Sequence, residues 1–265
     1  MKSIYLLTIF LIISQFISAQ VYHGKETEKF AKNADMVRIS EMSKIPSFIK
    51  FEKTFKINEI NAIDYTEELI GSNRIDFTFQ NTVRSKSNSF SSRYTPTIDG
   101  YPIEFSSWII HVKDGNVTSM NGSIPDNLPQ NIIFNITEEE ALKVALNYMG
   151  AESYMWEDKG MEDLLKQIKN DENATYYPKG EKVIAPNKIT FIDSELKPTY
   201  KFNIYSSKPL DRKMVYVDAQ TGQVLFDLSL IHFSEKSDKE DDDPEIPTDV
   251  IGTAHTVYKI GRAHV

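Results

Sequence analysis

The pattern of apolar and polar residues between Arg93 and Ile124 predicts three strands joined by two tight turns. Asp99-Gly100 and Asp114-Gly115 each supply a glycine where a tight turn needs positive φ. The longest predicted strand is rich in β-branched and aromatic residues, namely Ile103, Phe105, Trp108, Ile110 and Val112. We therefore expect an antiparallel meander, and its residues include no reactive group.

The residues before this meander show both helical and strand periodicity. Apolar residues recur at helical spacing over 57–70, and apolar and polar residues alternate over 74–83. These patterns predict a helix followed by a half-buried strand. Residues 46–55 are expected to be extended, the serine-rich segment 85–92 to be a hairpin loop, and the polar segment 25–32 to be mobile.

The clearest helix of the chain is predicted over 137–150. Thr137 can cap its N-terminus, Glu140 completes a capping box, and Gly150 ends it. Its apolar face consists of Ala141, Leu142, Ala145, Leu146 and Met149. A second, polar helix is predicted over 161–169, and strands are predicted over 183–193, 199–205, 213–218 and 223–233.

The first 19 residues differ in kind from the rest. A positive n-region at Lys2, an apolar run and the small pair Ser18-Ala19 are typical of a secretory signal peptide, cut between Ala19 and Gln20. A short membrane anchor is the alternative, and the apolar run is short for a membrane span. The chain is therefore expected to be secreted, with no membrane association after signal removal.

Charge and cysteine content exclude some functions. The net charge is −8 at pH 7, and no basic stripe is present that would bind the phosphates of nucleic acid. Without cysteine there is neither a disulfide nor a cysteine nucleophile. Residues 235–245 form an acidic run ended by prolines, which predicts a solvated linker. A calcium site is the alternative, but the ligand spacing of a calcium loop is missing.

Candidate catalytic motifs are absent from the sequence. None of the five histidines begins an H-E-x-x-H motif, and there is no G-x-S-x-G elbow. His111 and His232 lie in predicted strands and are interpreted as structural residues rather than ligands. Trp108 and Trp156 are expected to fill the core or a domain interface. The alternative is an aromatic platform for a carbohydrate or a peptide.

The order of residues from Arg93 to Ile124 resembles the fungalysin/thermolysin propeptide (FTP) domain, which precedes the catalytic part of secreted thermolysin-like zinc metallopeptidases. The residues that carry this resemblance are Gly100, Pro102, Ile103, Gly115, Asn121 and Gly122. Tyr101 occupies a variable position of the family pattern, and Ile103 replaces a valine. The resemblance implies a domain without catalytic residues.

Residues 136–233 resemble a PepSY domain, the module that commonly follows FTP in such precursors. Thr137-Glu138-Glu139-Glu140-Ala141-Leu142 matches the helix start, and Val215 to Val224 matches the ending. The matching positions of that ending include Tyr216, Asp218 and Gly222.

The last residues resemble the beginning of a mature thermolysin-like enzyme, because the segment from Asp249 to Tyr258 is similar to the opening strand of that family. The candidate processing and cleft-binding tail is therefore Glu245, Ile246, Pro247, Thr248, Asp249, Val250, Ile251 and Gly252. Residues 260–265 are also what one frame of a sequencing adapter encodes. We expect a truncated precursor whose last six residues are foreign.

The expected fold class is α+β, with two small domains, each an antiparallel cystatin-like sheet packed by a helix, followed by an extended acidic tail. The expected organisation is a signal peptide (1–19), an FTP-like domain (20–130), a PepSY domain (131–233), a linker (234–248), the start of the mature peptidase (249–259) and a foreign end (260–265).

The resemblance implies a propeptide that acts in cis as folding chaperone and inhibitor until it is removed by proteolysis. Its partner is the cognate metallopeptidase catalytic domain, and nucleic acid is not expected to bind. No cofactor is expected in this chain, since zinc and calcium belong to the catalytic domain. The main alternative is a free-standing secreted FTP/PepSY protein that regulates a separate protease in trans. The third possible function is that of a surface or carbohydrate-binding module.

Overall fold

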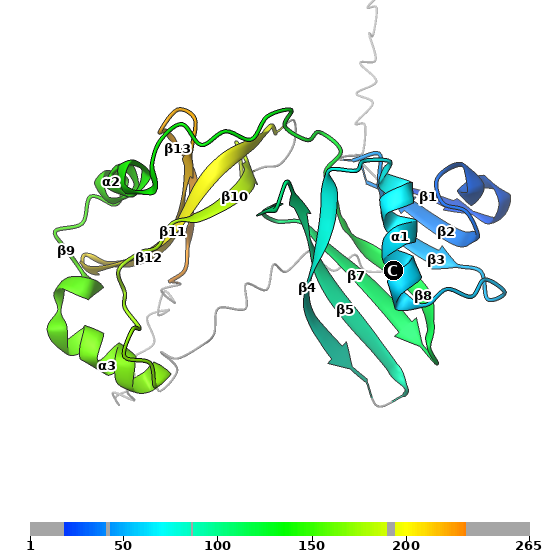
Figure 1. Cartoon of the computed structure of the whole chain (residues 1–265), viewed down its shortest axis with the longest axis horizontal. Helices are drawn as coiled ribbons and strands as arrows, with labels where there is room; N and C mark the ends of the chain where they lie inside the picture. The colour runs from blue at the N-terminus through cyan, green and yellow to red at the C-terminus, as the bar shows by residue number, and fades with distance from the viewer. Residues whose placement is uncertain (1–18, 41–42, 86, 190–193, 232–265) are drawn as a thin grey trace, which may run out of the picture. The chain divides into compact units, whose positions relative to one another are not determined.

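The computed structural model describes residues 19–40, 43–85, 87–189 and 194–231, which have an α+β fold with mostly antiparallel sheets (Figure 1). The chain divides into two compact units. The first holds the described residues up to Phe134 together with Lys182–Thr199. The second holds Asn135–Glu181 and the described residues from Tyr200 onward. The expected α+β class is confirmed.

The first unit is built on one antiparallel sheet with the order β1-β2-β3-β8-β7-β5-β4, to which the short strand β6 adds beside β5. Its elements are β1 (Gln20–His23), the 3-10 helix η1 (Gly24–Lys29), β2 (Ala34–Ile39), β3 (Pro46–Phe51), α1 (Glu59–Ile70), β4 (Ile75–Arg84), β5 (Ser89–Ile98), β6 (Tyr101–Pro102), β7 (Ser107–Lys113) and β8 (Asn116–Ser123).

Helix α1 packs on one face of this sheet (Figure 1). The Asn58 side chain caps its N-terminus by accepting a hydrogen bond from the Asn61 N–H, and Gly71 ends it in the left-handed conformation. Ala62 and Thr66 point into the core formed with the sheet. The sheet contributes fully buried side chains to this core, namely Val37, Ile49, Trp108, Ile110 and Met120.

Most elements predicted for this unit are confirmed, with three corrections. The segment 25–32, predicted to be mobile, is ordered: most of it belongs to η1, in which the Thr27 side chain is completely buried. Residues 89–92 of the predicted serine-rich loop belong to β5. The long strand predicted through Ile103 and Phe105 is broken, since β6 ends at Pro102 and Phe105 adopts a φ of 61° before β7 begins.

The second sheet has the order β10-β11-β12-β13, with β9 paired to β11. The remaining elements are α2 (Glu138–Met149), β9 (Ser153–Tyr154), the 3-10 helix η2 (Met155–Glu157), α3 (Lys159–Lys169), β10 (Glu181–Pro186), β11 (Leu196–Lys208), β12 (Leu210–Asp218) and β13 (Val224–Ser229). The predicted capping box of α2 is present, and Gly150 follows its last turn with a φ of 60°.

Helix α3 differs from the polar helix that was predicted. Met161, Leu164, Leu165 and Ile168 form an apolar stripe at helical spacing. Leu165 is buried, whereas Leu164 and Ile168 remain about half exposed, at 46% each. The stripe was missed because it spans only two turns between charged residues.

The segment Lys182–Thr199 packs with the first unit although it follows α3 in the sequence. Ile184 forms a parallel bridge with Ile103, and its carbonyl accepts a hydrogen bond of 2.8 Å from the Glu104 N–H. These isoleucines and Ile98 form a small, fully buried cluster. Sequence pattern gave no indication of this long-range contact.

Candidate functional site

The sheet of the first unit has a second face, opposite α1, that carries mostly polar side chains. Trp108, Ile110 and Val112 of β7 point into the core with α1, so Ile109 and His111 point the other way. Antiparallel register extends this face across six strands in two neighbouring rows. We call it the open face: Asn81, Arg93, Ile109, Asn121, Phe48 and Arg38 in one row, and Val83, Ser91, His111, Ser119, Lys50 and Met36 in the other.

Three hydrogen-bonded side chains on the open face link β5, β7 and β8. The Ser91 Oγ lies 2.8 Å from His111 Nδ1, and His111 Nε2 lies 2.6 Å from Asn121 Oδ1. Because an amide oxygen only accepts, Nε2 must carry the proton, and Nδ1 of the neutral ring accepts from the Ser91 hydroxyl. The three residues belong to the adjacent strands β5, β7 and β8, so these hydrogen bonds help to fix the register of the three strands.

This arrangement contains the residue types of a nucleophilic triad, and its chemistry differs from one. In a Ser-His-Asp triad a carboxylate stabilises the imidazolium, and separate donors bind the oxyanion. Asn121 is neutral, and Ser91 lies near the start of strand β5 rather than at a helix N-terminus. The arrangement is therefore a structural cross-strand link, in keeping with the interpretation of His111 as a structural residue.

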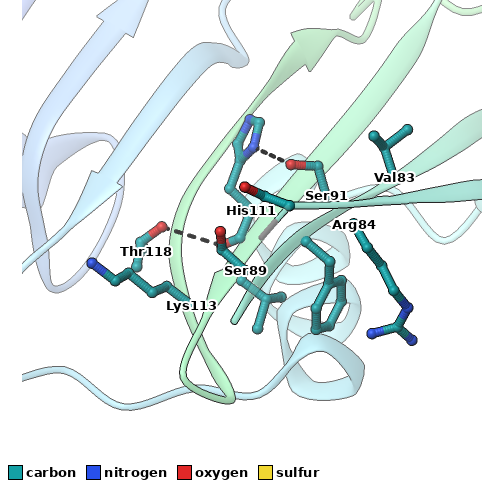
Figure 2. A pocket seen from close by; sticks show the side chains of 10 residues that line it. Val83, Arg84, Ser89, Ser91, His111, Lys113 and Thr118 are labelled. Carbon is teal, nitrogen blue, oxygen red and sulfur yellow. Dashed lines mark hydrogen bonds between the residues drawn. The ribbon is translucent and has the colours of Figure 1, made fainter. Parts of the chain in front are cut away.

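An open hollow of about 360 Å³ lies at one end of this face, over the ends of β4, β5 and β7 (Figure 2). Ser91 and His111 point toward each other there, and Lys113 and Thr118 lie beside them (Figure 2). Thr118 donates a hydrogen bond of 3.3 Å to the carbonyl oxygen of His111. The hollow is open and is lined by both polar and apolar side chains, so it suits contact with a surface better than enclosure of a small molecule.

The two rows of the open face hold three cations and no carboxylate. The Arg38 guanidinium lies 5.7 Å from the centre of the Phe48 ring. Lys50 is paired with Asp35 at 2.6 Å, and this hydrogen bond lowers the pKa of Asp35. Arg93 is exposed and has no ion pair with any described residue. The face is thus positive on a chain that is negative overall.

The residues that carry the family motif in the first unit make turns and close contacts. Asp99-Gly100 and Asp114-Gly115 have positive φ at both residues, as tight hairpin turns of the primed type require. Pro102 ends β6, and Ile103 is almost completely buried. Gly122 lies opposite Trp108 in the β7–β8 register. These residues shape the meander, while Asn121 also reaches the open face.

The residues singled out in the second unit also have structural contacts. Asp218 Oδ1 accepts hydrogen bonds from the backbone N–H groups of Gln220 and Thr221, at 2.7 and 3.2 Å. Gly222 completes this turn with a φ of 73°, and its N–H bonds the Asp218 carbonyl at 2.9 Å. Tyr216 is buried and stacks on Phe226 with ring centres 4.4 Å apart.

The remaining sequence-predicted positions divide into those the structure describes and those it does not. Ala19 is exposed, and Gln20 begins β1, where it pairs with Ile39. The tail from Glu245 to Gly252 and the residues after it lie outside the described residues, as does His232. Trp108 is a core residue, whereas Trp156 stacks on Tyr154 with ring centres 4.3 Å apart and is half-buried.

Sequence reasoning missed Arg38, Phe48, Ser91 and Arg93 as members of one surface. Strand alternation in each segment is a usable signal for which face a residue takes, but strand order cannot be read from it. Within the described part of the chain, no three His, Asp or Glu side chains gather in a way that could hold a metal ion. No helix of this part is long and apolar enough to cross a bilayer.

Comparison with known proteins gives a motif match for the central strands of the first sheet. No curated protein sequence is significantly similar to the chain. Among solved structures, the Bacillus megaterium YpeB C-terminal domain aligns with 12% identity over 81% of this chain and 90% of that one, with a TM-score of 0.34. That likeness is too weak to bear on function. Residues 91–124, which include most of β5 and all of β6, β7 and β8, match the Fungalysin/Thermolysin Propeptide Motif.

Proposed function

We propose that this chain is the prosegment of a secreted thermolysin-like zinc endopeptidase, acting in cis until proteolysis removes it. The observation that carries the proposal is the propeptide motif at residues 91–124, which coincides with the centre of the first sheet. The signal-like residues 1–19, the PepSY-like ending around Tyr216 and the acidic run before Glu245 are consistent with such a precursor.

The proposed role of the prosegment follows from its binding to the folded state of the catalytic domain. A domain that binds the native catalytic domain and not its unfolded chain stabilises the native form by mass action. A flexible tether holds the two at an effective concentration on the order of millimolar. Cutting between Glu245 and Gly252 removes that advantage, so inhibition ends when the prosegment dissociates. In this proposal the zinc belongs to the catalytic domain, as the family resemblance implies.

The genomic sequence downstream of this chain separates the cis from the trans arrangement. A downstream H-E-x-x-H motif supports the precursor, because that helix supplies two zinc ligands and the general base. A native stop codon after Val265 supports the alternative, a free-standing secreted FTP/PepSY protein that regulates a separate protease.

The inhibitory role is tested by titrating residues 20–250 into the matching mature peptidase and measuring cleavage of casein. We expect inhibition that saturates, with no effect on a serine protease of unrelated fold as the control. Activity that stays constant at every excess of the prosegment contradicts the proposal. Cleavage of casein by the purified chain alone, with zinc added, would contradict the assignment of the chemistry to another domain.

A further inference from the structure

The open face combines positive charge with an arrangement that fits an extended peptide. Arg93 on β5 and Arg38 on β2 lie in the same row, with β7, β8 and β3 between them. Adjacent strands are about 4.8 Å apart, so the two arginines are about 19 Å apart across the sheet. Between them the row presents the apolar side chains Ile109 and Phe48 and the amide of Asn121.

The hydrogen bond from His111 fixes how Asn121 presents its amide. Its oxygen is bound to His111 Nε2 at 2.6 Å, so its NH2 group points away from the ring. Among the described residues this NH2 group has no hydrogen-bond partner. Two donors are therefore held in the middle of the row, where they can bind a carbonyl oxygen of an occupant.

We infer that the open face binds an extended segment of the peptidase that carries two carboxylates about six residues apart. An extended chain advances about 3.4 Å per residue, so six residues span the distance between the arginines and return both side chains to one side. Arginine binds carboxylate through paired N–H donors, which favours this anion. The inference rests on the proposed function only in naming the peptidase as the source of the segment.

The acidic chemistry of the occupant follows from charge complementarity. The two rows contain three cations and no carboxylate, and only Lys50 is neutralised, by Asp35. The strands of this sheet carry two carboxylates, Asp35 of β2, which is bound to Lys50, and Asp76 near the start of β4. The apolar residues between the arginines favour a segment with β-branched residues between its two acids.

The test uses the full chain and a fluorescent peptide, Asp-Thr-Val-Thr-Val-Thr-Asp with both ends blocked, followed by fluorescence anisotropy. We expect saturable binding that weakens with salt, because exposed charge pairs are screened. Replacing both aspartates by asparagine should weaken binding about tenfold, and placing them two residues apart should weaken it similarly.

Variants locate the binding on this face. Arg93→Gln and Arg38→Gln should each weaken binding about threefold, and the pair should weaken it about tenfold. Lys56→Gln removes an exposed charge outside the rows and should leave binding unchanged. Circular dichroism and thermal unfolding confirm that each variant is folded. Unchanged affinity in the double variant overturns the inference.

Two further outcomes separate this inference from its alternatives. A linear polyphosphate that binds as tightly as the peptide overturns peptide recognition, because charge alone then suffices. In the peptidase assay, inhibition that is equal for wild type and the double arginine variant overturns the role of this face and leaves the proposed function standing. Peptide binding without any inhibition of the peptidase contradicts the proposed function instead.

Discussion

Trp108 and Gly122 are direct partners across β7 and β8, and the pair leaves no room for a side chain on the glycine. A Cβ atom built on Gly122 would lie 1.9 Å from the Ser107 carbonyl oxygen and 2.9 Å from Cε3 of Trp108. Trp108 is completely buried, so its ring cannot move toward solvent. Close packing against Ser107 and Trp108 thus explains why the second residue of the Asn-Gly pair in the propeptide motif is glycine.

Replacing Gly122 by alanine should strongly destabilise the first unit. The new methyl group must displace backbone, and overpacking of this kind costs about 3 kcal/mol. Gly115→Ala is the matched control: its φ is 76° and nothing lies within 4 Å of the added atom. That change should cost only about 1 kcal/mol, for the left-handed conformation. Urea unfolding measures both, and equal losses would contradict the packing argument.

The buried hydroxyl of Thr66 on α1 links the helix to the sheet. It accepts a hydrogen bond of 3.1 Å from Trp108 Nε1 and donates one of 2.7 Å to the Ala62 carbonyl. Thr66→Val keeps the shape but leaves the indole N–H without a partner in the core, which costs about 2 kcal/mol. Thr66→Ser keeps the hydroxyl and should retain that hydrogen bond.

Tryptophan fluorescence during urea unfolding follows this change, since Trp108 is at the site of the substitution. We expect the valine variant to unfold at lower urea than the serine variant. A serine variant that is less stable than the valine variant would show that the lost methyl group matters more than the hydrogen bond.

Stability should decline at alkaline pH through Tyr94. Burial and its hydrogen bond of 2.8 Å to Glu59 raise the pKa of the Tyr94 phenol above its usual value near 10. A group with a raised pKa in the folded state stabilises that state below its unfolded pKa, and this contribution is lost as pH rises further. Burial also raises the pKa of Tyr65, so its contribution is lost in the same direction.

The measurement is the free energy of unfolding of wild type and Tyr94→Phe at about pH 8 and about pH 11. Phenylalanine cannot ionise, so the variant should lose less stability between the two pH values than wild type does. An identical loss in both proteins would exclude Tyr94 as a source of the alkaline decline.

In the second unit, the Asp227 carboxylate joins α2, β12 and β13. It accepts a hydrogen bond of 2.9 Å from the Tyr148 hydroxyl and lies 2.9 Å from Lys213 Nζ. The hydrogen bond to Asp227 raises the pKa of Lys213. Asp227→Asn should cost about 1 kcal/mol, because the pair is partly buried, and the cost should shrink at high salt.

Asp163→Asn provides the comparison for this ion pair. Asp163 pairs with Lys159 on the exposed surface of α3, where the lysine side chain is 87% exposed. Such a pair contributes little, so thermal unfolding should be nearly unchanged. A cost for Asp163→Asn as large as that for Asp227→Asn would contradict the role assigned to burial.

Several local features could be predicted because their causes lie within a few residues. The capping box of Thr137 and Glu140, the left-handed residue Gly150 and the two Asp-Gly turns all depend on short-range geometry. The break at Phe105 could not be predicted in this way, since its local pattern favours a continuous strand. The adjacent Glu104 N–H bonds the Ile184 carbonyl, far along the sequence.

The candidate site shows the same division more clearly. Alternation within β7 is enough to place His111 and Trp108 on opposite faces, but not to name the partners of His111. Those partners, Ser91 and Asn121, are set by the register of three strands. Arg38 and Arg93 lie on the same surface only because β2 and β5 belong to the same sheet.

Local sequence pattern was enough to predict the capped helix at 137–150, the turns with their glycines and the propeptide motif of the central meander. Each depends on side-chain periodicity or on the φ of one residue, both of which act locally. The tertiary structure alone decided the strand order, the burial of Thr27 and the assembly of the open face. Hydrogen bonding between distant strands brings these residues together, and periodicity along one segment contains no information about its neighbour.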